Sequence, residues 1–200
     1  MIWWCKARAL PLIAAATLGT ILVGLAIGDI ELPIPVLTGQ SGQFLLAHLM
    51  TLIPAATLLY GLSRSDAQST HTAARPIRSW DTALGLLTAG TGATCAVICH
   101  LMLGSDLALV IGRNQAGYIG LALLLAPLLG PQLAAATLAA LPLTLAAGGW
   151  RPNGAPKPWA WLLHDPGSTP AILITLGLLG VGSLMSLGWT RSPLRLGATP

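Results

Sequence analysis

Six stretches of about twenty residues, each almost free of charge, follow one another along the 200-residue sequence. A helix needs about twenty apolar residues to cross the ~30 Å of hydrocarbon in a bilayer. Only 8% of the residues are charged and 54% are hydrophobic, whereas a soluble domain carries about a quarter charged residues to solvate its surface. The sequence therefore predicts an integral membrane protein.

The apolar runs predict an all-α, polytopic membrane protein with one transmembrane domain over residues 1–200. Backbone polar groups in lipid must be paired within their own segment, so each run is expected to form a helix. The alternating pattern of an outer-membrane barrel does not occur in the sequence. The six predicted transmembrane spans cover about 9–28, 43–63, 81–102, 106–129, 132–149 and 169–189.

The distribution of lysine and arginine predicts how the spans are oriented. Cytoplasmic connections of membrane proteins carry an excess of these residues. With a cytoplasmic N-terminus, seven would lie inside, namely Lys6, Arg8, Arg64, Arg75, Arg78, Arg191 and Arg195. Two would lie outside, Arg151 and Lys157. We therefore expect both termini in the cytoplasm and a multi-pass protein of the plasma membrane.

Several classes of function find little support in the sequence. The pI is about 9.4, but the basic residues lie at span ends and form no basic face, which argues against nucleic-acid binding. The sequence contains no Ser-His-Asp pattern and no pair of carboxylates within one span, so neither pattern indicates an enzyme. The sequence also contains no nucleotide-binding motif and points to no cofactor.

Possible metal ligands occur in the third predicted span. The run CAVICH places Cys95 and Cys99 four residues apart, with His100 beside one of them. A soft-metal site is conceivable, but no further ligand stands out, and small membrane-buried cysteines are the simpler interpretation. His48 has Thr51 one turn away in the second span, and we interpret it as a hydrogen-bonded core histidine.

The run GRNQAGYIG interrupts the fourth span with polar side chains. Arg113 follows Asp106 by seven residues, so its Cα would lie about 10 Å deep at ~1.5 Å per residue. In one interpretation Arg113 snorkels towards the outer surface and pairs with Asp106. In the other, Arg113, Asn114 and Gln115 face a polar cavity or another subunit, as ionisable residues in spans usually do.

Small residues recur every four positions in the same run. Gly112, Ala116 and Gly120 form a stripe that lets another helix approach closely. Arg113 borders this stripe, so it is expected to face protein and not lipid.

The only long inside loop ends in the run TAARPIRSWD. Arg75 and Arg78 lie three residues apart, and Pro76 denies the loop a continuous helix into the third span. Asp81 is expected in the first turn of that span, where it would complement the helix dipole. Trp80 would lie at the membrane interface. The two arginines could serve orientation and attraction to anionic lipid, or they could dock a partner.

Three stretches resemble a known group of proteins: TAARPIRSWDTAL, GRNQAGYIGLALL and WAWLLHDP, which together extend over most of residues 72–165. They resemble poorly characterised actinobacterial membrane proteins associated with ABC-type ATPases. The six-span layout, with both ends inside and one long inside loop, is similar to the permease subunit of an ABC-2-type exporter. None of these stretches has an assigned chemistry.

The resemblance implies an export permease that lacks its own motor. A separate cytoplasmic ATP-binding subunit would hydrolyse ATP and dock on the inside loop, with Arg75, Arg78, Trp80 and Asp81 as its contact residues. A second membrane subunit, either another copy or a homologue, would complete the pathway.

Two other functions remain open on the sequence. The first is a non-transporting accessory or immunity-type protein that binds a partner within the bilayer. The second is a small membrane enzyme, which should bring acidic or histidine pairs together across spans. A co-purifying ATPase would separate the permease from the accessory protein.

Overall fold

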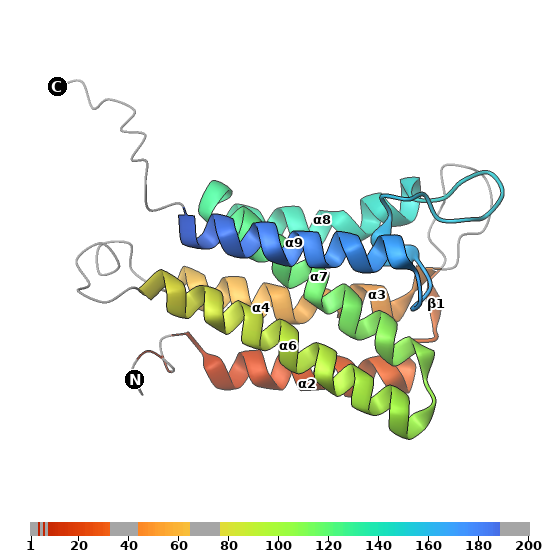
Figure 1. Ribbon diagram of the computed structural model, residues 1–200, viewed down its shortest axis with the longest axis horizontal. Coiled ribbons are helices and arrows are strands. Elements are labelled where there is room, and N and C mark those ends of the chain that lie inside the picture. The colour runs from red at the N-terminus through yellow and green to blue at the C-terminus, as the bar shows by residue number, and fades with distance from the viewer. Residues whose placement is uncertain (1–3, 5, 7, 33–43, 65–76, 189–200) are drawn as a thin grey trace.

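The computed structural model describes residues 4, 6, 8–32, 44–64 and 77–188 of the chain. These residues are helical apart from one short strand pair and the connecting turns (Figure 1). The helices are α2 (Leu10–Ile27), α3 (Leu46–Met50), α4 (Leu52–Ser63), α6 (Ile77–Leu103), α7 (Asp106–Leu129), α8 (Pro131–Gly148) and α9 (Thr169–Gly188). The remaining elements are the strands β1 (Glu31–Leu32) and β2 (Phe44–Leu45) and the 3-10 turn η1 (Trp161–Leu163).

Six helical segments are long and apolar enough to cross a membrane, which supports a membrane protein. They confirm the six predicted spans in number and place, and the fourth span coincides with α7. The second span divides at Thr51 into α3 and α4, and the Thr51 hydroxyl donates to the His48 carbonyl oxygen at 2.8 Å.

The third span starts earlier than predicted. The helix α6 begins at Ile77, directly after Pro76 in the sequence, so Asp81 is its fifth residue. The prediction that Asp81 lies in the first turn and complements the helix dipole is therefore wrong. Its carboxylate instead has a partner from another part of the chain, described below.

The helices lie side by side and give the bundle two ends (Figure 1). One end, called the Arg8 end, holds the start of α2, the end of α4, the start of α6 and the end of α9. The opposite end, called the Arg113 end, holds the strand pair, the turn between α6 and α7, and the segment 149–168. In that turn Gly104 adopts a φ of 66°, a conformation that glycine reaches without steric cost.

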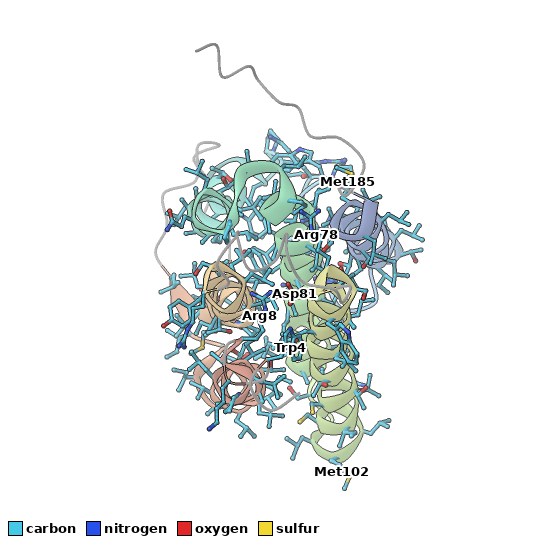
Figure 2. The ribbon with its side chains drawn as sticks, turned by 90° about the vertical axis from the view of Figure 1, so that its left-hand side faces the viewer. Trp4, Arg8, Arg78, Asp81, Met102 and Met185 are labelled. Carbon is cyan, nitrogen blue, oxygen red and sulfur yellow. The ribbon has the colours of Figure 1, made fainter. Side chains whose placement is uncertain are left out.

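The helix α7 is the centre of the bundle. It lies between the other helices when the molecule is viewed from the Arg8 end (Figure 2), and it contacts α2, α3, α4, α6, α8 and α9. Its side chains Tyr118, Ile119 and Leu123 are almost fully buried. The outer helices instead expose large apolar side chains such as Leu22 and Leu184, as expected of helices whose outer faces contact lipid.

Close helix contacts occur where α7 carries glycine. A Cβ atom built on Gly112 would lie 2.4 Å from the Cβ atom of Ala96 in α6. One built on Gly120 would lie 2.6 Å from the backbone nitrogen of Leu179 in α9. From the other side, a Cβ atom on Gly182 would lie 2.2 Å from the Gly120 carbonyl oxygen. The small residues therefore let α7 approach α6 and α9 at backbone distance.

Candidate functional site

The segment 149–168 folds back onto the Arg113 end of the bundle. The backbone nitrogen of Lys157 donates to the Gly149 carbonyl oxygen at 2.7 Å, which closes the segment into a loop. Beyond this closure, Trp161 is buried and meets Tyr118 of α7 edge to face, with ring centroids 5.6 Å apart. The second half of the segment is therefore part of the protein core.

Arg113 fastens α7 to this segment. Its Nη1 donates to the Asp165 carbonyl oxygen and its Nη2 to the His164 carbonyl oxygen, both at 2.6 Å. Its Nε and Nη2 donate to Asn114 Oδ1 at 3.2 and 3.1 Å. The planar guanidinium uses its fixed fork of donors, so it holds two neighbouring carbonyls and one amide in a single arrangement.

Asn114 continues the same connection. Its side chain is fully buried, and its Nδ2 donates to the Leu162 carbonyl oxygen at 3.1 Å. Arg113 and Asn114, with the carbonyls of Leu162, His164 and Asp165, are called the Arg113 clamp from here on. All of its acceptors are neutral oxygens.

The imidazole of His164 fixes the backbone that carries these carbonyls. Its Nε2 lies 3.0 Å from the Lys157 carbonyl oxygen, and its Nδ1 lies 3.1 Å from Ser168 Oγ. Because a carbonyl oxygen only accepts, the proton belongs on Nε2, and the Ser168 hydroxyl donates to Nδ1. His164 therefore ties both flanks of the clamp to each other.

The predicted pairing of Arg113 with Asp106 is wrong. The Asp106 side chain is 76% exposed, and its Oδ1 lies 3.5 Å from Nδ1 of the His100 imidazole. The segment 162–165 folds over α7 and supplies carbonyl acceptors for Arg113. The guanidinium therefore points towards this segment and not towards Asp106, two turns earlier in α7. Among the described residues, Arg113 has no acidic side chain within 4.0 Å.

The predicted polar cluster is divided in the structure. Gln115 is fully buried but faces α6, since a Cβ atom on Gly92 would lie 2.5 Å from its Nε2. Neither polar atom of the Gln115 side chain has a hydrogen-bond partner among the described residues. Arg113 and Asn114 therefore form one site, and Gln115 lies outside it.

The residues with possible metal chemistry lie apart from the clamp. Cys95 and Cys99 are half-buried and pack beside Ile111, and His100 Nδ1 is 3.2 Å from the Ser105 carbonyl oxygen. In the part of the chain that the structure describes, no three His, Cys, Asp or Glu side chains lie close enough to hold a metal ion.

A second polar site lies at the Arg8 end (Figure 2). The Arg8 Nη2 and Asp81 Oδ2 are 2.5 Å apart, and the two side chains are only 3% and 13% exposed. The Arg8 Nη1 also donates to the carbonyl oxygens of Gly61 and Leu62 at the end of α4, at 3.4 and 3.3 Å. Arg8, which lies two residues before α2, is thus joined to both α4 and α6.

Two further contacts extend this site. Trp80 meets Trp4 edge to face with ring centroids 6.1 Å apart. The Thr82 hydroxyl donates to Ser186 Oγ of α9 at 2.8 Å. Arg8, Asp81, Trp4, Trp80 and the Thr82–Ser186 bond are together called the Arg8 network. Of the predicted contact residues, Arg78 lies beside this network in α6, and Arg75 lies outside the described residues.

Sequence reasoning missed both sets of partners. The sequence analysis used Arg8 only as one of the positive charges that predict the orientation. Arg8 and Asp81 are nevertheless opposite charges at span ends on the same predicted side of the membrane. That coincidence is a signal that could have suggested the pair. The acceptors of Arg113 are backbone carbonyls, and these leave no signal in the residue types.

The architecture supports one class, the helical membrane proteins, because six of its helical segments are long and apolar enough to cross a bilayer. No family model, curated protein or solved structure matches this chain.

Replacing Arg113 with lysine is expected to loosen the segment 162–165. A lysine ammonium cannot reproduce the planar fork of donors, and each hydrogen bond to a charged group is worth about 1.5–3 kcal/mol. The reporter is Ala160→Cys, a fully buried position, in a background without native cysteines. Its labelling by a water-soluble maleimide should speed up about tenfold, the factor that corresponds to ~1.4 kcal/mol.

Arg151→Lys is the matched control for this substitution. Arg151 is exposed and belongs to the same segment, where its backbone makes hydrogen bonds that fold the loop. Its variant should label at the rate of the parent protein. Equal rates for the Arg113 and Arg151 variants would show that the clamp does not hold the segment.

Proposed function

We propose that the chain is the membrane-spanning permease subunit of an ABC-type transporter, and that it works in export. A separate cytoplasmic ATP-binding subunit supplies the energy, and a second membrane subunit, a copy or a homologue, completes the pathway. Both termini and the Arg8 end face the cytoplasm, and the protein resides in the plasma membrane. The observation that carries the proposal is the Arg8 network.

The Arg8 network supports the proposal because it connects a docking loop to several spans. In the structure, the predicted inside loop ends where α6 begins, at Ile77, and its residues 65–76 lie outside the described residues. The contacts of Asp81 reach Arg8 and thereby α4, and Thr82 reaches α9 through Ser186. A force that an ATPase applies to this loop would therefore act on α2, α4, α6 and α9 together.

The charge at this end supports the proposed orientation. Arg64 follows α4 and lies over the Tyr60 ring, with its Cζ 5.8 Å from the ring centroid. Arg78 is in the first turn of α6 at the same end. Arg151 and Lys157 are on the segment at the Arg113 end. The excess of positive charge at the Arg8 end favours the cytoplasmic side.

Purification from the native membrane in mild detergent tests the proposal. An ATP-binding subunit should co-purify with the chain. The double variant Arg75→Glu, Arg78→Glu should lose it, because reversed charges repel an acidic docking surface. The matched control Arg151→Glu, Lys157→Glu reverses two charges at the opposite end and should retain the subunit.

Single cysteines at Ser69 and Asn153 establish that each variant is correctly inserted. In a background without native cysteines they should label from opposite sides of the membrane. A correctly inserted parent protein that brings down no ATPase would contradict the permease and favour the accessory or immunity-type protein. A correctly inserted double variant that keeps the ATPase would exclude this arginine pair as the contact.

A further inference from the structure

A groove of about 540 Å³ runs along the side of the bundle between α6 and α9. The helix α7 forms its floor, with Gly112 and Ala116. Apolar residues line its two walls, from Leu86 to Val97 on α6 and from Ile172 to Leu179 on α9. The two polar residues in its lining are Arg113 and Thr175.

The groove has the length of one leaflet. Leu86 and Val97 are eleven residues apart on α6, which corresponds to about 16 Å at ~1.5 Å per residue. The hydrocarbon core of a bilayer is about 30 Å thick, so the groove covers about half of it. Arg113 lies towards the end of the groove that is nearer the membrane surface, and apolar lining continues below it.

The charge of Arg113 is not neutralised by its partners. Its four hydrogen bonds go to neutral oxygens, and a guanidinium has five N–H donors, so one N–H of Nη1 has no acceptor among the described residues. Asp165 is exposed, and its carboxylate favours the charge from beyond ion-pair distance. A cation partly buried beside hydrocarbon favours an anionic partner.

Thr175 is the second polar residue in the lining of the groove. It is only 4% exposed, and its hydroxyl has no hydrogen-bond partner among the described residues. Both α7 and α9 begin at the Arg113 end (Figure 1), and Gly120 lies against Leu179. This register places Thr175 beside Ala116, about one turn or ~5 Å deeper than Arg113.

We propose that this groove binds one anionic phospholipid. The lipid phosphate contacts Arg113, the ester region lies beside Thr175, and one acyl chain lies between α6 and α9. The order of these contacts follows the order of the chemical groups in a phospholipid, from the charged headgroup to the hydrocarbon. The site stands independently of the proposed transport function, because its contacts need no second subunit.

Native mass spectrometry of the purified full-length protein tests the headgroup contact. The probes are phosphatidylglycerol and phosphatidylcholine with identical acyl chains. The parent protein should bind phosphatidylglycerol about fivefold more tightly, as expected for ~1 kcal/mol from one cation near an anionic lipid. In Arg113→Gln this preference should disappear, while Asp165→Asn should increase it because a competing negative charge is removed.

The acyl-chain contact is tested by filling the groove. A Cβ atom on Gly90 meets no described atom within 4 Å, and Gly90 lines the groove. Gly90→Trp should therefore fold and weaken the binding of both lipids. Gly177→Trp is the matched control, since a Cβ atom there is equally free of described atoms and Gly177 does not line the groove.

Three results would overturn the proposal. The first is equal affinity of the parent protein for the two lipids. The second is an unchanged preference for phosphatidylglycerol in both single variants, Arg113→Gln and Asp165→Asn. This comparison holds even if Arg113→Gln loosens the clamp, because Asp165→Asn leaves the clamp carbonyl in place. The third is equal lipid binding by Gly90→Trp and Gly177→Trp.

Discussion

Replacing Asp81 with alanine is expected to lower the free energy of unfolding by about 3–5 kcal/mol, because the substitution leaves a buried cation without its counter-charge. Arg8 is 3% exposed and would keep only the carbonyl oxygens of Gly61 and Leu62 as acceptors. Reversible unfolding in mixed detergent and SDS micelles, followed by helical circular dichroism, measures this change.

Asp106→Ala is the matched control for the Asp81 variant. Both acids are in helices of the same bundle, but the Asp106 side chain is 76% exposed, so its removal should change the free energy of unfolding by less than about 0.5 kcal/mol. The double variant Arg8→Met, Asp81→Leu should recover most of the loss, since apolar side chains can replace a buried ion pair. A loss no larger for Asp81→Ala than for Asp106→Ala would contradict the importance of the pair.

Replacing Gly182 with leucine is expected to separate α7 and α9 and to cost about 3 kcal/mol, at the upper end of overpacking effects. Its Cβ atom would lie 2.2 Å from the Gly120 carbonyl oxygen, and a backbone atom cannot move aside as a flexible side chain can. The helices must then shift, which also opens the groove and strains the Thr82–Ser186 bond. The same SDS titration measures the loss.

Gly180→Leu is the control, two residues away on the same helix. A Cβ atom on Gly180 meets no described atom within 4 Å, so leucine there adds only helix propensity, worth up to about 1 kcal/mol over glycine. This variant should be as stable as the parent or slightly more stable. Similar losses at Gly180 and Gly182 would indicate a general effect of bulk and not a close contact between helices.

The number and position of the spans could be predicted from the sequence because hydropathy depends on residue type alone. The predicted bounds of the fourth span agree with α7 at both ends, since Asp106 begins the helix and Gly130 directly follows it. The start of α6 was missed by four residues. The polar residues between Ile77 and Asp81 predict a loop, but they form the first turn of α6. Tertiary contacts of Asp81 and Trp80 stabilise this turn.

The partners of the polar residues could be predicted much less well. The seven-residue spacing suggested Asp106 as the ion-pair partner of Arg113. Spacing along the sequence reveals neighbours within one helix, but it does not show which separate elements lie close together. The actual acceptors lie about fifty positions later and are backbone oxygens, which every residue possesses. The close approach of Gly182 to Gly120 depends in the same way on how two helices are placed relative to each other.

The Arg113 clamp also has a consequence for biosynthesis. A membrane protein is inserted while it is translated, and α7 leaves the ribosome before the segment 162–165, which follows Arg113 by about fifty residues. During that interval the nascent chain holds a guanidinium in the membrane with Asn114 as its sole clamp acceptor. The guanidinium of Arg113 is therefore made before the carbonyl oxygens of His164 and Asp165 that accept its hydrogen bonds. Translation of roughly fifty further residues separates the synthesis of Arg113 from that of these acceptors.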